Sequence, residues 1–175
     1  SQSLDNMLEL LLAGGLDAPQ AMRLMIPPAW QTVDGLDPDL RAFYEYYATH
    51  MEPWDGPAGI VLTDGRHACC VMDRNGLRPA RWVQTRDRHI TLASEIGVWD
   101  YKPEDVIAKG RLKPGEMIAI DTKTSKMLMS DDIDKQLQNR HPYEIWMRDR
   151  LIRLSADPVN SPFSALAMDK ETLTR

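Results

Sequence analysis

The sequence is poor in cysteine and contains no metal-binding spacing. Its only two cysteines, Cys69 and Cys70, are adjacent in a chain of 175 residues. Neighbouring residues on a strand point to opposite faces, so the two thiols cannot form an ordinary disulfide or share a tetrahedral metal site. No CxxC or HExxH spacing occurs, and the four histidines are scattered. We therefore expect no metal site, and we expect a reducing, cytoplasmic setting.

The sequence also lacks a long apolar run and a basic cluster. No apolar stretch approaches the roughly 18 residues of a membrane span, and no signal peptide is recognisable, so we expect neither a membrane protein nor a secreted one. The formal net charge is −5, with the two signs interleaved. Because phosphate binding needs clustered Lys and Arg, nucleic acid is not expected as a partner. The chain begins at Ser1 without methionine, and we expect it to be a piece of a longer polypeptide.

Apolar residues make up 43% of the chain, enough for a packed core, and the first third has helical spacing. A first helix is predicted from about Leu4 to Leu12, ended by Gly14-Gly15. A second opens with Asp17 as its N-cap and must end before Pro27. A third opens with Asp37-Pro38, a cap followed by proline at the first helical position.

The period then changes to that of strands. We predict strands at Gly59–Thr63, His67–Met72, Trp82-Val83, His89–Leu92, Glu116–Ile120 and Met127–Met129. A helical region follows from Asp132 to about Leu154, broken at His141-Pro142. Helices followed by antiparallel strands are typical of an α+β layered domain. We expect residues 1–150 to form this domain and residues 151–175 to be a linker or the start of a following domain.

The segment Asp73–Trp82 combines a forced turn, three arginines and a proline between two apolar strand-like runs. Asn75-Gly76 is a strong turn signal, because both residues tolerate positive φ. Two functional readings exist: an oxyanion hole at this turn, or arginines that bind a carboxylate or phosphate. We favour a structural hairpin near the site, in which the arginines pair with Asp73, Glu95 or neighbouring acids. Its members are Asp73, Arg74, Asn75, Gly76, Arg78, Pro79, Ser94 and Glu95.

No residue of the chain is predicted to be catalytic. A terminal Ser1 has the hydroxyl and amine that nucleophilic chemistry requires, but the residues after it enter a helix. Cys69 and Cys70 lie in a run that reads as a core strand, and no neighbouring residue would lower their pKa. Trp54 either lines a tunnel or domain contact, or anchors the crossover from helix to sheet; we favour the anchor.

The pair formed by Asp73–Pro79 and Ala93-Ser94-Glu95 resembles a strand-turn-strand element of class II glutamine amidotransferases. A closer resemblance, to the large chains of the glutamate synthase family, covers about residues 1–150 without large gaps. It is carried by LDNMLELL (residues 4–11), MRLMIPPAWQ (22–31), MEPWDGPA (51–58), ASEIGVWDY (93–101) and PGE (114–116).

The resemblance implies the later portion of a glutaminase domain with the four-layer αββα fold of N-terminal-nucleophile hydrolases. In that family the nucleophile is the thiol of the mature chain's first residue, here expected upstream of Ser1, and its own α-amino group is the base. The parent enzyme hydrolyses glutamine, channels the ammonia to 2-oxoglutarate and reduces the product to a second glutamate. It uses FMN, an iron–sulfur cluster and NAD(P)H through an FAD-containing small subunit; this portion is expected to hold no cofactor and to be inactive alone.

Two other functions stay open at this point. One is the glutaminase domain of another class II amidotransferase, such as the phosphoribosyl-transferring kind. The other is a non-catalytic interaction or structural module, whose exposed sheet edges would pair with a partner.

Overall fold

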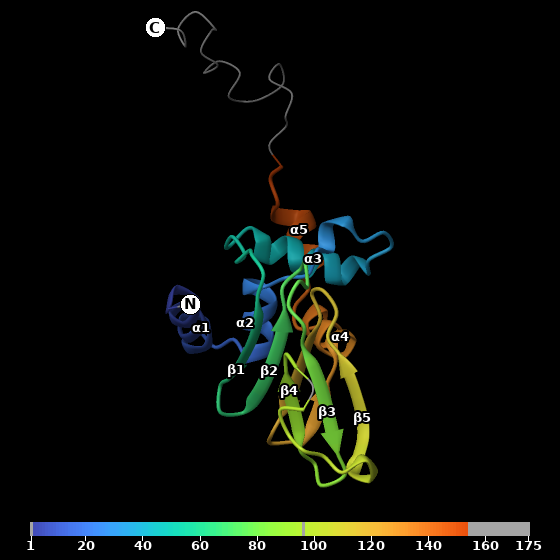
Figure 1. Ribbon diagram of the computed structural model, residues 1–175. Coiled ribbons are helices and arrows are strands. Elements are labelled where there is room, and N and C mark those ends of the chain that lie inside the picture. Colours follow the sequence, from blue (N-terminus) through green and yellow to red (C-terminus); the bar gives the residue numbers. More distant parts are fainter. Residues whose placement is uncertain (1, 96, 154–175) are drawn as a thin grey trace, which may run out of the picture.

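The computed structural model describes residues 2–95 and 97–153 of the chain, and Figure 1 shows their arrangement. These residues form five α-helices and seven β-strands. The helices are α1 (Gln2–Ala13), α2 (Ala18–Met25), α3 (Pro38–Ala48), α4 (Ser130–Gln138) and α5 (Tyr143–Arg150). The strands are β1 (Gly59–Thr63), β2 (His67–Met72), β3 (Arg81–Thr85), β4 (Ile90–Ala93), β5 (Val106–Arg111), β6 (Met117–Asp121) and β7 (Lys126–Leu128). Two short 3₁₀ turns, Trp30–Thr32 and Pro103–Asp105, complete the set.

The predicted helix starts are confirmed by their caps. The Asp17 carboxylate accepts the backbone N–H of Gln20 at 3.0 Å, and α2 follows with a proline in its first turn. The Asp37 carboxylate accepts the N–H of Asp39 at 2.9 Å at the start of α3. Each cap satisfies one of the N–H groups that a helix leaves unpaired at its N-terminus.

The strands form two antiparallel sheets. One has the order β1-β2-β6-β7 and the other the order β4-β3-β5. Six of the seven strands were predicted; β5 was missed, because its second half is Lys109-Gly110-Arg111 and offers no apolar alternation. The helical region near the C-terminus is broken at His141-Pro142 as predicted, into α4 and α5.

The prediction of a hairpin at Asp73–Trp82 is wrong. The strands on either side of this segment, β2 and β3, belong to different sheets. β2 already pairs with β1 on one edge and with β6 on the other, so neither of its edges is free for β3. The turn at Gly76 is real, with a φ of 59°. It serves a crossover between the sheets, and we call residues 73–80 the crossover segment.

The two sheets pack face to face, with helices on one side. Cys69 and Val71 of β2 face a core shared with the helices, whereas Cys70 and Met72 face a second core between the sheets. The prediction that the two cysteines point to opposite faces is therefore confirmed. The described residues thus form three layers in the order helices, β1-β2-β6-β7, β4-β3-β5. In Figure 1, α3 and α5 lie together at one end of the strands.

No helix within the described residues is both long enough and apolar enough to cross a bilayer. The predicted linker lies almost wholly outside the described residues, since residues 154–175 are not among them. Leu154, the expected end of the last helical region, is also outside; α5 itself ends at Arg150.

Candidate functional site

Asp73 is the anchor of the crossover segment. Its side chain is buried, and its Oδ1 accepts the N–H of Ala58 at 3.1 Å, just before β1. Its Oδ2 accepts the N–H of Asn75 at 2.9 Å and that of Gly76 at 3.2 Å. Its backbone carbonyl accepts the N–H of Gly115 at 2.9 Å, in the turn before β6. One acidic residue thus fixes three backbone segments.

These hydrogen bonds argue against an oxyanion hole at the turn. The N–H groups of Asn75 and Gly76 both point at the Asp73 carboxylate, and that of Gly76 also meets the Asp73 carbonyl at 3.1 Å. Donors that already serve a carboxylate are not available to a developing negative charge. The turn is also tightly packed, since a Cβ added at Gly76 would lie 2.6 Å from Pro114.

The crossover segment is linked to the helices through Gly115. A Cβ at Gly115 would lie 2.7 Å from Pro28, which follows α2. The Gly115 carbonyl accepts a hydrogen bond from Nη1 of Arg23 at 2.6 Å. The Arg23 guanidinium also binds Asp134 of α4, with Nε to Oδ1 at 2.9 Å and Nη2 to Oδ2 at 3.3 Å, and Tyr44 donates to Asp134 at 3.4 Å. A continuous polar network therefore runs from the crossover segment into the helical layer.

Burial and the charge of Arg23 shift the pKa of Asp134 in opposite directions. Burial raises the pKa of Asp134 above its ordinary value, and the Arg23 guanidinium offsets part of that rise. Burial also raises the pKa of Tyr44. Tyr44 therefore remains a protonated hydrogen-bond donor throughout the physiological range.

One arginine of the crossover segment pairs with a neighbouring acid, one of the alternatives predicted. Arg74 pairs with the exposed Asp55, not with Asp73, whose acceptors serve backbone N–H groups. Arg78 and Pro79 are exposed. Ser94 and Glu95 are exposed at the end of β4, and among the hydrogen bonds of the described residues none joins them to Asp73–Pro79.

The two cysteines are buried in the cores, as predicted for structural residues. Burial raises the pKa of Cys69 to about 12 and that of Cys70 to about 11. Both thiols therefore stay protonated near neutral pH and are poor nucleophiles. Ser1 lies outside the described residues. Trp54 packs against the helix-side core, and its backbone N–H donates to the Met25 carbonyl at 2.8 Å; both contacts support its interpretation as an anchor of the crossover from helix to sheet.

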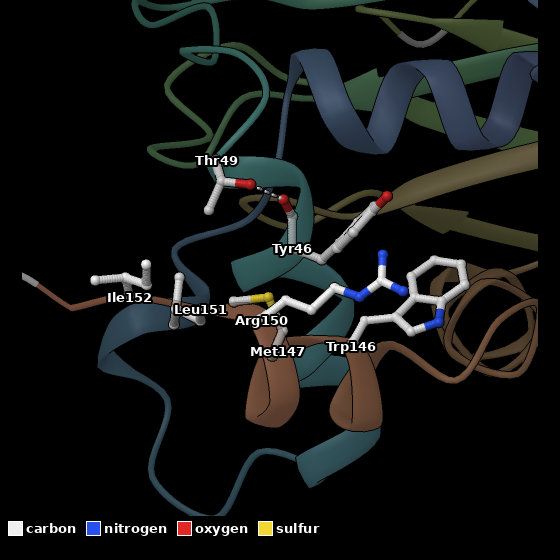
Figure 2. Close-up of a pocket in the computed structure, with 7 residues that line it drawn as sticks. All are labelled: Tyr46, Thr49, Trp146, Met147, Arg150, Leu151 and Ile152. Atoms are coloured by element: carbon white, nitrogen blue, oxygen red, sulfur yellow. Dashed lines mark hydrogen bonds between the residues drawn. The ribbon is translucent and has the colours of Figure 1, made fainter.

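A cavity of about 460 Å³ lies on the outer side of α3 and α5 (Figure 2). Figure 2 shows Arg150 with its guanidinium beside the Trp146 ring, and Thr49 donating to the Tyr46 carbonyl, a contact of 2.7 Å. The cavity is lined by Tyr46, Thr49, Trp146, Met147, Arg150, Leu151 and Ile152. The Thr49 hydroxyl lies 3.2 Å from Nδ1 of His50, but both atoms also meet the Tyr46 carbonyl, at 2.7 and 2.8 Å, so this pair is engaged with the backbone. No cluster of three metal-ligating side chains occurs in the part of the chain described.

The pairing of Arg23 with Asp134 was not predicted from the sequence. Every residue of α2 is buried, so the helix has no exposed polar face. The spacing of its apolar residues therefore did not indicate that Arg23 is buried and bound to an acid. Asp134 lies 111 positions away from its partner, and no local pattern connects them. A fully buried arginine indicates a paired charge only after the fold is known.

Comparison with known proteins assigns this architecture to a family. Residues 1–146 match the family model of class-II glutamine amidotransferases. The chain belongs to the class II glutamine amidotransferase family.

Individual relatives indicate which members of this family the chain resembles. The chain is 37% identical over 158 residues to the glutamate synthase [NADPH] large chain of Bacillus subtilis, covering 90% of this chain and 10% of that protein. It is 40% identical to the ferredoxin-dependent glutamate synthase of Oryza sativa subsp. japonica, over 100% of this chain and 11% of that protein. It is 41% identical to the glutamate synthase [NADH] of Saccharomyces cerevisiae, over 88% of this chain and 7% of that protein. The resemblance to glutamate synthases is thus confirmed, and the chain spans about a tenth of the length of these relatives.

Proposed function

We propose that this chain is the later part of the glutaminase domain of a glutamate synthase large chain. In that role it supports the hydrolysis of glutamine to glutamate and ammonia, while the nucleophilic thiol comes from outside these 175 residues. The parent enzyme then passes the ammonia to 2-oxoglutarate and reduces the product to a second glutamate. The crossover segment and its network serve as the scaffold that holds the sheets and helices of this domain together.

The observation that carries this proposal is the extent of the identity. The three glutamate synthases compared above match between 88% and 100% of the chain at 37–41% identity. These relatives favour a glutamate synthase over a phosphoribosyl-transferring amidotransferase. The protonated, buried state of both thiols supports a nucleophile elsewhere.

We further propose that the three layers described here belong to a four-layer αββα domain. Family membership supports this, as does the face-to-face packing of two antiparallel sheets with helices on one side. The fourth layer would cover the outer face of β4-β3-β5. The boundary near residue 150 and the linker role of residues 151–175 remain predictions.

Cofactors and partners follow from the same proposal. FMN and an iron–sulfur cluster would be bound by other parts of the polypeptide, where ammonia is used. Electrons would come from NAD(P)H through a flavoprotein small subunit, although the names of the relatives include NADPH, NADH and ferredoxin as donors. Glutamine is the proposed substrate, and a cytoplasmic setting stays a prediction.

Ammonia release from glutamine tests the proposal. The 175-residue chain alone should release none above the buffer rate. A longer polypeptide that adds the upstream part of the domain should be active, and replacing its first-residue cysteine by serine should abolish the activity. Turnover by the short chain that is lost in Cys69→Ser, Cys70→Ser or Ser1→Ala would contradict the proposal.

A further inference from the structure

Asn75 and Gly76 form a dipeptide that is chemically reactive in an open chain. The backbone nitrogen of the residue after an asparagine can attack the carbonyl carbon of the asparagine side chain, and glycine in that position has no Cβ to hinder the attack. The side chain of Asn75 is exposed, and its amide takes part in none of the hydrogen bonds found among the described residues. The dipeptide therefore has the local chemistry of a deamidation site.

Deamidation of this dipeptide passes through a cyclic imide and needs only water as co-reactant. The Gly76 nitrogen loses its proton and bonds to Cγ of Asn75. The bond from Cγ to the side-chain nitrogen breaks, and that nitrogen takes up a proton and leaves as ammonia. Water then opens the imide at one of its two carbonyl carbons. One product is aspartate, and the other is isoaspartate, in which the backbone runs through the former side chain and is one methylene longer.

The folded crossover segment opposes the first step at the Gly76 nitrogen. The N–H of Gly76 donates to Oδ2 of Asp73 at 3.2 Å and to the Asp73 carbonyl at 3.1 Å. The attacking species is the deprotonated nitrogen, and the buried Asp73 carboxylate beside it disfavours a second negative charge. Ring closure would also remove the N–H and both of its hydrogen bonds. Asp73 therefore protects the dipeptide while the segment is closed.

Packing restrains the same residue. A Cβ added at Gly76 would lie 2.6 Å from Cγ and 2.8 Å from Cα of Pro114, in the turn before β6. The N–H of Asn75 is also held, by Oδ2 of Asp73 at 2.9 Å. The Gly76 backbone cannot rotate toward the Asn75 side chain while these contacts persist. The reaction therefore requires that the crossover segment first opens.

Asp34 and Gly35 form a turn without these restraints. Both residues are exposed, between the Trp30–Thr32 turn and α3. Gly35 has a φ of 69°, similar to the 59° of Gly76. A Cβ at Gly35 would meet nothing within 4 Å, and the Gly35 N–H donates none of the hydrogen bonds found in the described part of the chain. Asp34→Asn therefore places the reactive dipeptide in an unprotected turn.

We propose that Asn75-Gly76 is a latent deamidation site, which Asp73 keeps unreactive in the folded protein and which reacts once the crossover segment opens. Isoaspartate then prevents the segment from closing again. The backbone is one methylene too long for the turn, and the new carboxylate lies beside the buried Asp73 carboxylate. The modification thus makes a reversible opening of the crossover segment permanent. It goes beyond glutamine hydrolysis and does not depend on it.

Asp34→Asn compares the two dipeptides within one molecule, the longer polypeptide of the proposed function. The protein is incubated at pH 8, and peptide mass spectrometry follows deamidation at both positions. In the native protein, position 34 should react at least about tenfold faster than Asn75, because Asn75 reacts only from an open state. In concentrated urea the two rates should be similar. Equal rates in the native protein, or a slow Asn75 in urea, would overturn the proposal.

Two aspartate variants separate protection by Asp73 from overall stability. Asp73→Asn keeps the shape of the side chain, removes its charge and should speed deamidation of Asn75 several-fold. Asp121→Asn is the matched control, because Asp121 is also buried and its Oδ1 accepts the N–H of Lys123 at 2.9 Å and that of Thr124 at 3.1 Å in another turn. It should leave the Asn75 rate unchanged. Equal rates in both variants would overturn the protective role of Asp73.

The effect of isoaspartate on the crossover segment has its own test. Anion exchange separates the aged protein by its added negative charge, and an isoaspartate-specific methyltransferase identifies the isoaspartate product at position 75. This product should unfold at a lower Tm than Asn75→Asp, which carries the same charge on a backbone of normal length. Equal Tm values would show that the segment closes around isoaspartate and would overturn permanent opening. These readouts do not involve glutamine, so failure of this proposal and failure of the proposed function are distinguishable.

Discussion

Arg23 and Asp134 form a buried two-point ion pair that joins α2 to α4. The Arg23 side chain is 1% exposed and that of Asp134 17%. A third bond, from Nη1 of Arg23 to the Gly115 carbonyl at 2.6 Å, extends the pair to the turn that Asp73 also holds. The Arg23 guanidinium thus connects α4, through Asp134, to the turn before β6, through the Gly115 carbonyl.

Removing that guanidinium should be costly. Arg23→Met keeps much of the side-chain volume but removes the Arg23 donor from the Gly115 carbonyl and leaves Asp134 with the 3.4 Å hydrogen bond from Tyr44. Breaking a buried pair from one side costs about 3–5 kcal/mol, because an uncompensated charge remains. We expect a decrease of about 3 kcal/mol in the free energy of unfolding, measured by urea denaturation at pH 7.

The double variant separates the pair from the packing. Arg23→Met combined with Asp134→Leu removes both charges and should recover part of the loss, since neutral replacement of a buried pair is often tolerated. Arg148→Met, which breaks an exposed pair with Asp149, is the control and should change stability by less than about 1 kcal/mol. Additive losses in the double variant would show that the two side chains act separately.

The turn of the crossover segment gives a second prediction. Gly76 and Gly65 both have positive φ, 59° and 87°, but only Gly76 has neighbours within reach of a Cβ. Gly65→Ala should cost about 1–2 kcal/mol, the ordinary cost of a left-handed alanine. Gly76→Ala should cost at least about 2 kcal/mol more, because its Cβ meets Pro114 as well. Equal Tm shifts in the two variants would mean that Pro114 moves aside freely.

Features specified within a few residues of sequence were predictable. Asp17 and Asp37 mark their helix starts through hydrogen bonds that span two or three residues. The opposite orientation of Cys69 and Cys70 follows from the pleat of a strand. The layered α+β class followed from the order of such local elements.

Features that depend on distant pairing were not predictable. The turn chemistry of Asn75-Gly76 is the same in a hairpin and in a crossover, and only the occupation of both β2 edges decides between them. The sequence left open which acid Arg74 would pair with; backbone N–H groups occupy the Asp73 carboxylate, and Arg74 pairs with Asp55. The Arg23–Asp134 pair required the tertiary structure itself.

Asp64, in the β1–β2 turn, should make stability depend on pH. Desolvation acts to raise its pKa, but hydrogen bonds from the backbone and ring of His67 and the backbone of Arg66 outweigh it and lower the pKa to about 2. Because the folded-state pKa is depressed, the stabilisation is present above the ordinary value near 3.8 and is lost as pH falls toward 2. Asp64→Asn should lose up to about 2 kcal/mol at pH 7.

The pH series distinguishes this effect from a simple packing loss. Urea denaturation at pH 7, 4 and 2 should show the gap between wild type and Asp64→Asn closing toward the lowest pH. Asp5→Asn, on the exposed surface of α1, is the control for removing one negative charge. A gap that is constant across the series would show that the Asp64 charge contributes nothing.

Thiol reactivity bears directly on where the catalytic nucleophile lies. A cysteine that attacks an amide must be partly ionised and open to substrate, whereas Cys69 and Cys70 are buried, with pKa values raised to about 12 and about 11. Native protein at pH 8 should therefore show no thiol that reacts quickly with a disulfide reagent such as dithiobis(nitrobenzoate), and urea should expose two. Cys69→Ala and Cys70→Ala, each losing one of those two thiols, assign the signals. A fast native thiol that glutamine protects would place the nucleophile in this chain, and the division of the domain into a scaffold here and a nucleophile elsewhere would then be wrong.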